Sequence, residues 1–256
     1  MIVFLGLTSI ILSAWLTRLF SHSSARFQML DFPNERSLHE RPTPRSGGVA
    51  IVASVFSVGV MGAIAFRAPP LLLWIWLGAL AIAVVSFLDD RMNFSPLYRL
   101  LVHVVAAWLL VYADVGFSTL SLPGIAWVLP MPAAVVISLL FVVWMVNLYN
   151  FMDGMDGFAG GMAVFGFGVF AVMGWMAEHD MFFFISLIVA AASAGFLIFN
   201  FPPARIFMGD IGSSTLGFLA AALSLWGARD GVFPVWIAVL VFSPFIVDAT
   251  ATLLRR

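Results

Sequence analysis

Long apolar stretches with short polar breaks between them dominate this chain. Nine segments approach the roughly 20 apolar residues that a membrane-spanning helix needs. They are 2–20, 48–66, 70–88, 99–114, 133–149, 158–176, 182–199, 212–228 and 233–253. Because lipid cannot hydrogen-bond free backbone N–H and C=O groups, we expect each segment to be helical. The pattern predicts an all-α, polytopic transmembrane helix bundle of about nine spans.

The composition agrees with a lipid environment. The 256 residues are 62% hydrophobic and 10% charged, with a mean hydropathy of +1.07, whereas about 25% charged residues is typical of soluble domains. The net charge of −1 gives no electrostatic reason to expect nucleic-acid binding. Cysteine is absent, which excludes disulfides. We treat residues 1–256 as a single membrane domain with a long first loop, 21–47.

The arginines predict the orientation of the bundle. If the nine spans alternate, ten arginines lie on the side of the loops 21–47, 89–98, 150–157 and 200–211 and of the C-terminus, and only Arg67 and Arg229 lie on the other. By the positive-inside rule the first side is cytoplasmic and the N-terminus lies outside. Six tryptophans near the opposite helix ends fit an aromatic belt: Trp74, Trp76, Trp127, Trp175, Trp226 and Trp236.

Carboxylates gather on the same predicted cytoplasmic side. Six of the thirteen acidic residues lie at helix ends there: Asp89, Asp90, Asp153, Asp156, Asp210 and Asp248. A carboxylate close to hydrocarbon is costly and usually marks function. Any one of them could be a hydrated residue at the edge of a loop. Three separate clusters on one face favour a shared site on the cytoplasmic face.

The segment from Asn147 to Gly157 (NLYNFMDGMDG) is the richest of these clusters. Two carboxylates three residues apart can lie on one side of a helical turn. Oxygen ligands from aspartate and asparagine are what a hard cation such as Mg²⁺ accepts. The next helix is expected to start near Gly157, where free N–H groups can hold phosphate. The EF-hand spacing is absent.

A second segment, Asn200 to Thr215 (NFPPARIFMGDIGSST), repeats this design with an amide, a base, an aromatic ring and a Gly-Asp-x-Gly turn. It lacks the Gly-Lys-Ser/Thr of a Walker loop. The alternative interpretation is a glycine-rich helix start that Ser213 or Ser214 caps.

Two further groups complete the chemistry. The adjacent carboxylates Asp89 and Asp90 repel each other unless a cation is near, or else they cap the helix expected near Leu97. The first loop offers His39, Arg41, Arg45 and a helix start at Gly47-Gly48 as a phosphate-binding set, or an ordinary positive-inside anchor. Anionic substrates, a hard divalent cation and a bilayer together indicate phosphoryl transfer to a lipid.

Four motifs in this order resemble the polyprenyl-phosphate N-acetylhexosamine-1-phosphate transferases of glycosyltransferase family 4: 39–48, 87–91, 147–157 and 207–210. The details are most similar to branches that start bacterial O-antigen or other surface-glycan synthesis. The resemblance implies transfer of a sugar 1-phosphate from a UDP-N-acetylhexosamine to undecaprenyl phosphate, with release of UMP. It also implies the bacterial cytoplasmic membrane as the location and leaves a homodimer open.

The resemblance also implies roles for individual residues. Asn150 and Asp210 would contact Mg²⁺, for which Mn²⁺ could substitute. Asp89 and Asp90 would position or deprotonate the lipid phosphate, and Asp153 and Asp156 would serve the nucleotide-sugar side. Asn200 and Phe207 would hold uracil by an amide contact and stacking. Direct attack by the lipid phosphate and a covalent aspartyl intermediate both stay open, although the ionisation of a lipid phosphate near neutral pH favours direct attack.

The sequence departs from the family pattern in two places. The lysine that often follows the Asp-Asp pair is missing, so Arg91 or Arg99 must replace it. Family members continue beyond the region of Asp248 into a histidine-containing loop, so we expect a shortened C-terminus. Two other classes of membrane protein also use carboxylates. An ion- or proton-coupled transporter would hold its carboxylates near the bilayer midplane, and an intramembrane aspartyl protease would pair two of them there.

Overall fold

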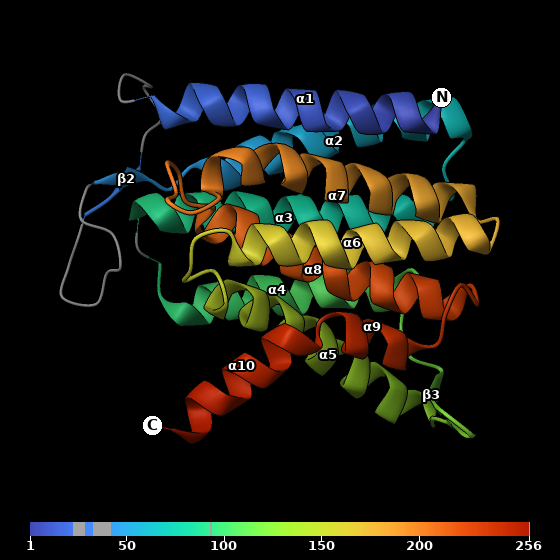
Figure 1. The fold of residues 1–256 in the computed structure, drawn as a ribbon. Helices are drawn as coiled ribbons and strands as arrows, with labels where there is room; N and C mark the ends of the chain where they lie inside the picture. Colours follow the sequence, from blue (N-terminus) through green and yellow to red (C-terminus); the bar gives the residue numbers. More distant parts are fainter. Residues whose placement is uncertain (23–28, 33–41, 93, 256) are drawn as a thin grey trace.

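The computed structural model describes residues 1–22, 29–32, 42–92 and 94–255, and it is a helix bundle (Figure 1). Ten helices are described: α1 Ile2–Ser21, α2 Gly47–Phe66, α3 Leu71–Met92, α4 Pro96–Tyr112, α5 Met131–Phe151, α6 Phe158–Met176, α7 Asp180–Asn200, α8 Gly209–Arg229, α9 Val235–Val241 and α10 Ser243–Leu254. Two short antiparallel pairs join β1 Leu30–Asp31 to β2 Thr43–Pro44 and β3 Thr119–Leu122 to β4 Ile125–Val128. The all-α prediction is confirmed.

The predicted spans coincide with these helices. Within the described ranges, seven helices are long and apolar enough to cross a membrane, and α4 is an apolar helix of 17 residues. The last predicted span is broken into α9 and α10, which meet at an angle of 61°. Pro244 stands in the first turn of α10, where its missing N–H and its ring prevent α9 from continuing. In Figure 1, α10 leaves the bundle and carries the C-terminus away from it.

Helix α8 lies at the centre of the bundle. It packs against α2, α3 and α5, and 94% of its apolar stretch is buried inside the protein. Small residues allow this close packing. A Cβ on Gly48 of α2 would lie 2.5 Å from the Cα of Gly212, and one on Gly217 would lie 2.8 Å from the carbonyl oxygen of Met145 in α5. The start of α8 is therefore held among the ends of its neighbours.

Trp226, one of the six tryptophans predicted to form an aromatic belt, lies in the core instead, so the prediction is wrong for this residue. Trp226 is fully buried, and its indole N–H donates a hydrogen bond of 2.6 Å to Asp230. It belongs to the core and not to an aromatic belt. The sequence could not predict this burial. Residues on all sides of α8 are apolar, so the pattern does not distinguish a helix inside the bundle from one that faces lipid.

Candidate active site

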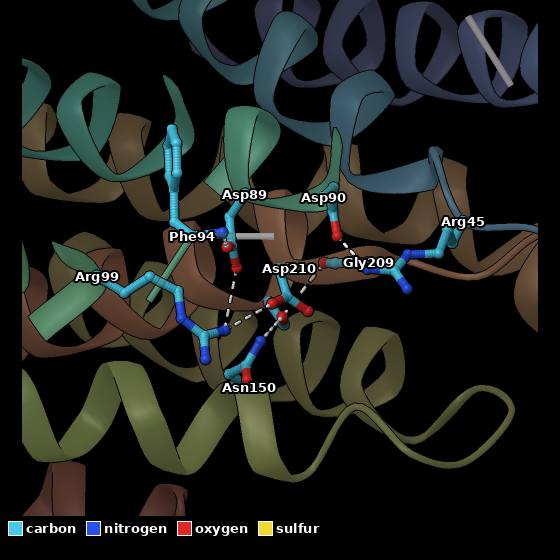
Figure 2. A network of polar contacts seen from close by, with 9 residues as sticks. Arg45, Asp89, Asp90, Phe94, Arg99, Asn150, Gly209 and Asp210 are labelled. Atoms are coloured by element: carbon cyan, nitrogen blue, oxygen red, sulfur yellow. Dashed lines mark hydrogen bonds and ion pairs between the residues drawn. The ribbon is translucent and has the colours of Figure 1, made fainter. Parts of the chain in front are cut away.

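Polar side chains from five parts of the chain meet at one end of the bundle (Figure 2). Asp89 and Asp90 stand in the last turn of α3, and Arg99 stands in the first turn of α4. Asn150 stands in the last turn of α5 and Asp210 in the first turn of α8. Arg45 lies just before α2 and completes the group. The helices run in alternating directions, so these ends come together although up to 165 residues separate them in the sequence.

Arg99 bridges two of the helices. Its Nη1 atom lies 3.1 Å from Oδ2 of Asp89 and 3.3 Å from Oδ2 of Asp210. The other oxygen of Asp89 accepts the backbone N–H of Phe94 at 2.7 Å. The guanidinium of Arg91, by contrast, lies over the ring of Phe87 at 4.5 Å from its centroid. Of the two arginines that the sequence offered in place of a lysine, Arg99 contacts both Asp89 and Asp210 in the described part of the chain.

Arg45 forms an ion pair with Oδ1 of Asp90. The pKa of Arg45 lies above its usual value. Burial alone would lower it, but the hydrogen bond to Asp90 and the negative charges of Asp90, Asp210 and Asp31 together outweigh this effect. The side chain of Asp90 is 0% exposed, and its Oδ2 atom has no hydrogen-bond partner among the described residues. A buried, unpaired carboxylate oxygen is costly unless a ligand satisfies it.

Asp153 reaches the same cluster from the loop after α5. Burial raises the pKa of Asp153 well above its usual range, and the charge of Asp210 raises it further, whereas a hydrogen bond from the backbone of Gly209 and the charge of Arg45 lower it. Gly209 has φ +73° and lies against the carbonyl oxygen of Arg45, so only glycine fits there without strain. Four carboxyl groups and two guanidinium groups thus surround the start of α8.

Asn150 is tied to α8 by its amide. Nδ2 donates to Oγ of Ser213 at 3.0 Å, and that hydroxyl donates to the carbonyl oxygen of Gly209 at 3.2 Å. Because α8 begins at Gly209, Ser213 is inside the helix, and the interpretation of Ser213 or Ser214 as its cap is wrong. A half-turn of the Asn150 amide would exchange nitrogen for oxygen and present an acceptor to a cation.

Asn200 and Asp156 join two loops. The side chain of Asn200 accepts the N–H of Gly157 at 3.0 Å and donates to the carbonyl oxygen of Ile206 at 2.9 Å, and the residue is 4% exposed. Asp156 accepts the N–H of Ala204 at 2.9 Å. These three bonds fasten the loop after α5 to the loop before α8. In this conformation both side chains organise the loops that carry Asp153 and Asp210.

The loop before α2 is fastened to the same region. The N–H of Phe207 donates to Pro44 at 2.7 Å, and the N–H groups of Gly47 and Gly48 donate to the carbonyl oxygens of Phe207 at 2.9 Å and Met208 at 2.8 Å. The interpretation of Gly47-Gly48 as a phosphate-binding helix start is therefore wrong, because backbone carbonyls occupy both groups. The ring of Phe207 is half-buried. His39 and Arg41 lie outside the described residues.

Comparison with known proteins places this architecture in a family. The family model described as glycosyl transferase family 4 matches residues 72–228, more than half of the chain. The chain belongs to glycosyl transferase family 4.

Three relatives show the range of the likeness. The "Probable undecaprenyl-phosphate N-acetylglucosaminyl 1-phosphate transferase" of Bacillus subtilis (strain 168) is 31% identical over 94% of this chain and 68% of its own length. The decaprenyl-phosphate N-acetylglucosaminephosphotransferase of Mycolicibacterium smegmatis is 32% identical over 97% and 68%. The phospho-N-acetylmuramoyl-pentapeptide-transferase of Geobacillus thermodenitrificans is 34% identical over 83% and 68%.

The donor atoms of this family 4 transferase suit the hard cation that the sequence predicts. Carboxylate and amide oxygens are the ligands that Mg²⁺ prefers, and the unpaired Oδ2 of Asp90 is one of them. If all four carboxyl groups were ionised, the two arginines would leave two negative charges uncompensated. Across the described ranges, no three carboxylate or imidazole groups are already arranged around a metal position. Oδ2 of Asp210 is paired with Arg99, so a cation at this oxygen would replace that contact.

Proposed function

We propose that this family 4 transferase moves an N-acetylhexosamine 1-phosphate from a UDP-sugar to undecaprenyl phosphate and releases UMP. The observation that carries the proposal is the meeting of Asp90, Asn150 and Asp210 with Arg45 and Arg99 at one end of a membrane bundle. The names of the relatives support both a polyprenyl phosphate and an amino-sugar phosphate as substrates. We expect the product to start a lipid-linked surface glycan such as O-antigen.

The proposed reaction exchanges one phosphorus–oxygen bond for another. An oxygen of the lipid phosphate forms a bond to the phosphorus next to the sugar. The bond between that phosphorus and the bridging oxygen breaks, and its electron pair leaves with UMP. A lipid phosphate is already largely ionised near neutral pH, because its second pKa is about 6. The protein must therefore align the phosphate and relieve charge repulsion, which favours direct attack over a covalent intermediate.

The polar groups of the site divide this work. Arg45 and Arg99 are the cations placed to attract the phosphate groups of both substrates. Asp90, Asn150 and Asp210 would hold Mg²⁺, which supplies a positive charge that polarises phosphoryl oxygens. Asp153, which accepts a hydrogen bond from the backbone of Gly209, lies in the loop that we assign to the nucleotide sugar. Phe207 offers a half-buried ring for the base.

The arginines support a cytoplasmic position for the site. Among the described residues, six arginines lie at the end of the bundle that holds the site: Arg18, Arg45, Arg91, Arg99, Arg205 and Arg255. Arg67 and Arg229 end helices at the opposite side. By the positive-inside rule this distribution supports an N-terminus outside a bacterial cytoplasmic membrane. UDP-sugars would then reach the site from the compartment in which nucleotides are made.

The test is lipid-dependent release of UMP. Membranes that contain the protein are incubated with a UDP-N-acetylhexosamine, with and without undecaprenyl phosphate and with Mg²⁺ or a chelator. We expect UMP only when both the lipid and Mg²⁺ are present, and we expect Mn²⁺ to substitute for Mg²⁺. Membranes that contain an Asp210→Asn variant are the matched control. Absence of release with all components present, or release that does not need the lipid, contradicts the proposal.

One observation favours a transporter as a second candidate. The pair α9 and α10 is a broken helix, and transporters use broken helices to bind ions. Transporter sites, however, lie near the bilayer midplane, whereas the carboxylates here lie at helix ends, and Asp248 on α10 is exposed. Substrate flux into proteoliposomes that an ion gradient drives and that Asp210→Asn abolishes would favour the transporter.

A further inference from the structure

The two adjacent aspartates of α3 face different surroundings. Successive residues of a helix point about 100° apart, as the 3.6-residue turn requires. Asp89 points toward α4: one oxygen accepts the N–H of Phe94 at 2.7 Å, and the other lies 3.1 Å from Nη1 of Arg99. The residue is 8% exposed. Both carboxylate oxygens of Asp89 are therefore engaged within the protein, and little of the side chain is open to a substrate.

Asp90 points toward the start of α8 instead. One oxygen pairs with Arg45, and the other, Oδ2, is buried without a hydrogen-bond partner in the described part of the chain. A Cβ placed on Gly209 would lie 3.6 Å from this oxygen, so Oδ2 faces the residue next to Asp210. Figure 2 shows the two carboxylates on separate sides of the α3 end, with Arg99 beside Asp89 and Arg45 beside Asp90.

We propose that Asp89 is a positioning residue for Arg99, whereas Asp90 is the member of the pair that meets the reactants. Arg99 contacts both Asp89 and Asp210. When another cation takes Asp210, the contact with Asp89 remains and keeps the guanidinium at the site, where it can meet the acceptor phosphate. Asp89 thereby determines where the positive charge stays. The identity of the reactants rests on the proposed function.

Asp89→Asn is a variant that removes the charge of Asp89 and can keep its hydrogen bond with the N–H of Phe94. Asn in place of Asp89 still has an oxygen that can accept the N–H of Phe94, so the turn between α3 and α4 is kept while the charge that holds Arg99 is removed. Asp90→Asn instead removes the charge that pairs with Arg45 and faces α8. Asp248→Asn, on an exposed part of α10, is the control for loss of a carboxylate outside the cluster.

A double-mutant cycle in activity tests whether Asp89 acts through Arg99. The KM for undecaprenyl phosphate and kcat are measured for Asp89→Asn, Arg99→Gln and the double variant. We expect each single variant to raise this KM about tenfold with a smaller change in kcat, and the double variant to match Arg99→Gln within about threefold. Effects that multiply in the double variant would overturn the proposal. For Asp90→Asn with Arg99→Gln, which do not touch, we expect multiplication.

Two measurements do not depend on catalysis. Mn²⁺ binding to the purified proteins is followed by electron paramagnetic resonance: we expect Asp90→Asn to weaken it at least about tenfold and Asp89→Asn to change it less than about threefold. Melting temperatures of the same variants should show coupling between Asp89 and Arg99 and none between Asp90 and Arg99. Equal loss of Mn²⁺ binding in both aspartate variants, wild-type protein that binds no Mn²⁺, or absent coupling of Asp89 to Arg99 overturns the division.

These outcomes separate the two proposals. Wild-type protein that releases no UMP contradicts the proposed function, while Mn²⁺ binding and melting still decide the roles of the two aspartates. Lipid-dependent release combined with independent effects of Asp89 and Arg99 contradicts only the positioning role.

Discussion

The bundle carries a polar cluster at each end, and the two clusters differ in how they are satisfied. At the end opposite the site, Oδ2 of Asp230 accepts the indole N–H of Trp226 at 2.6 Å and lies 3.0 Å from Nε2 of His179. Its other oxygen lies 3.7 Å from Arg229, which also approaches Asp114 at 3.5 Å. At the site end, Asp90 keeps one buried oxygen without a partner among the described residues.

The difference separates stability from function. The Asp230 cluster joins the end of α8 to the start of α7, since His179 also accepts the N–H of Phe182 there. Both carboxylate oxygens of Asp230 are paired with groups of the protein itself. The site cluster holds four carboxyl groups beside two guanidinium groups and leaves a buried acceptor open. A positively charged ligand would stabilise such an arrangement, because it would satisfy the open carboxylate oxygen.

The largest effect should come from Asp210→Asn compared with Asp230→Asn. We expect the first to reduce lipid-dependent UMP release at least about 100-fold with little change in melting temperature, since it weakens cation binding. The second should keep the activity within about twofold and lower the melting temperature, since its bonds are structural. UMP release and thermal unfolding of the same preparations check both. Similar activity losses in the two variants would erase the distinction between the clusters.

Removal of divalent cations should cause a loss of activity of similar size. A chelator should reduce UMP release to background, and return of Mg²⁺ should restore it. Saturating Mg²⁺, at about 100 times its dissociation constant, should also stabilise the wild-type protein by about 2.7 kcal/mol, because the ion binds only the folded state. Thermal unfolding with and without Mg²⁺ measures this. The Asp90→Asn variant should show a smaller shift, and an equal shift would place the ion elsewhere.

An effect of intermediate size should follow from Asn200→Ala, which loosens the loops on either side of the site. The change removes the side chain that joins Gly157 to Ile206, so we expect the KM for the UDP-sugar to rise about tenfold while the KM for the lipid changes less. Steady-state kinetics with each substrate varied in turn provide the measurement. Asn200→Asp, which keeps one acceptor, should lie between the wild type and the alanine variant. A selective rise in the lipid KM would show that this loop serves the other substrate.

The smallest effect should follow from Trp226→Phe. Phenylalanine keeps much of the buried ring but cannot donate to Asp230, so we expect a loss of about 1–3 kcal/mol in the free energy of unfolding. Activity per folded molecule should be unchanged. Thermal unfolding followed by assay of the folded fraction checks both expectations. A change in either KM would connect this end of the bundle to the site.

Much of the fold was predictable because apolar runs of near-membrane length leave little choice of structure. The meeting of Asp90, Asn150 and Asp210 at one end also followed from the alternation of spans. The two ion pairs of Arg99 did not, because they depend on how the start of α4 lies relative to the ends of α3 and α8, which a local sequence pattern cannot show. The backbone contacts of Gly47 and Gly48, and the burial of Trp226, likewise depend on which helix faces meet.

Helix α8 has the lowest hydropathy of the seven long helices, 1.4, and is also the most completely enclosed. During synthesis it therefore enters the membrane as the segment with the weakest preference for lipid, and its partners α2, α3 and α5 are already there to receive it. Asp210 is supplied by this late-arriving helix. A nascent chain that has not yet produced α8 lacks that carboxylate, so under the proposed function activity would begin only after the central helix has been inserted.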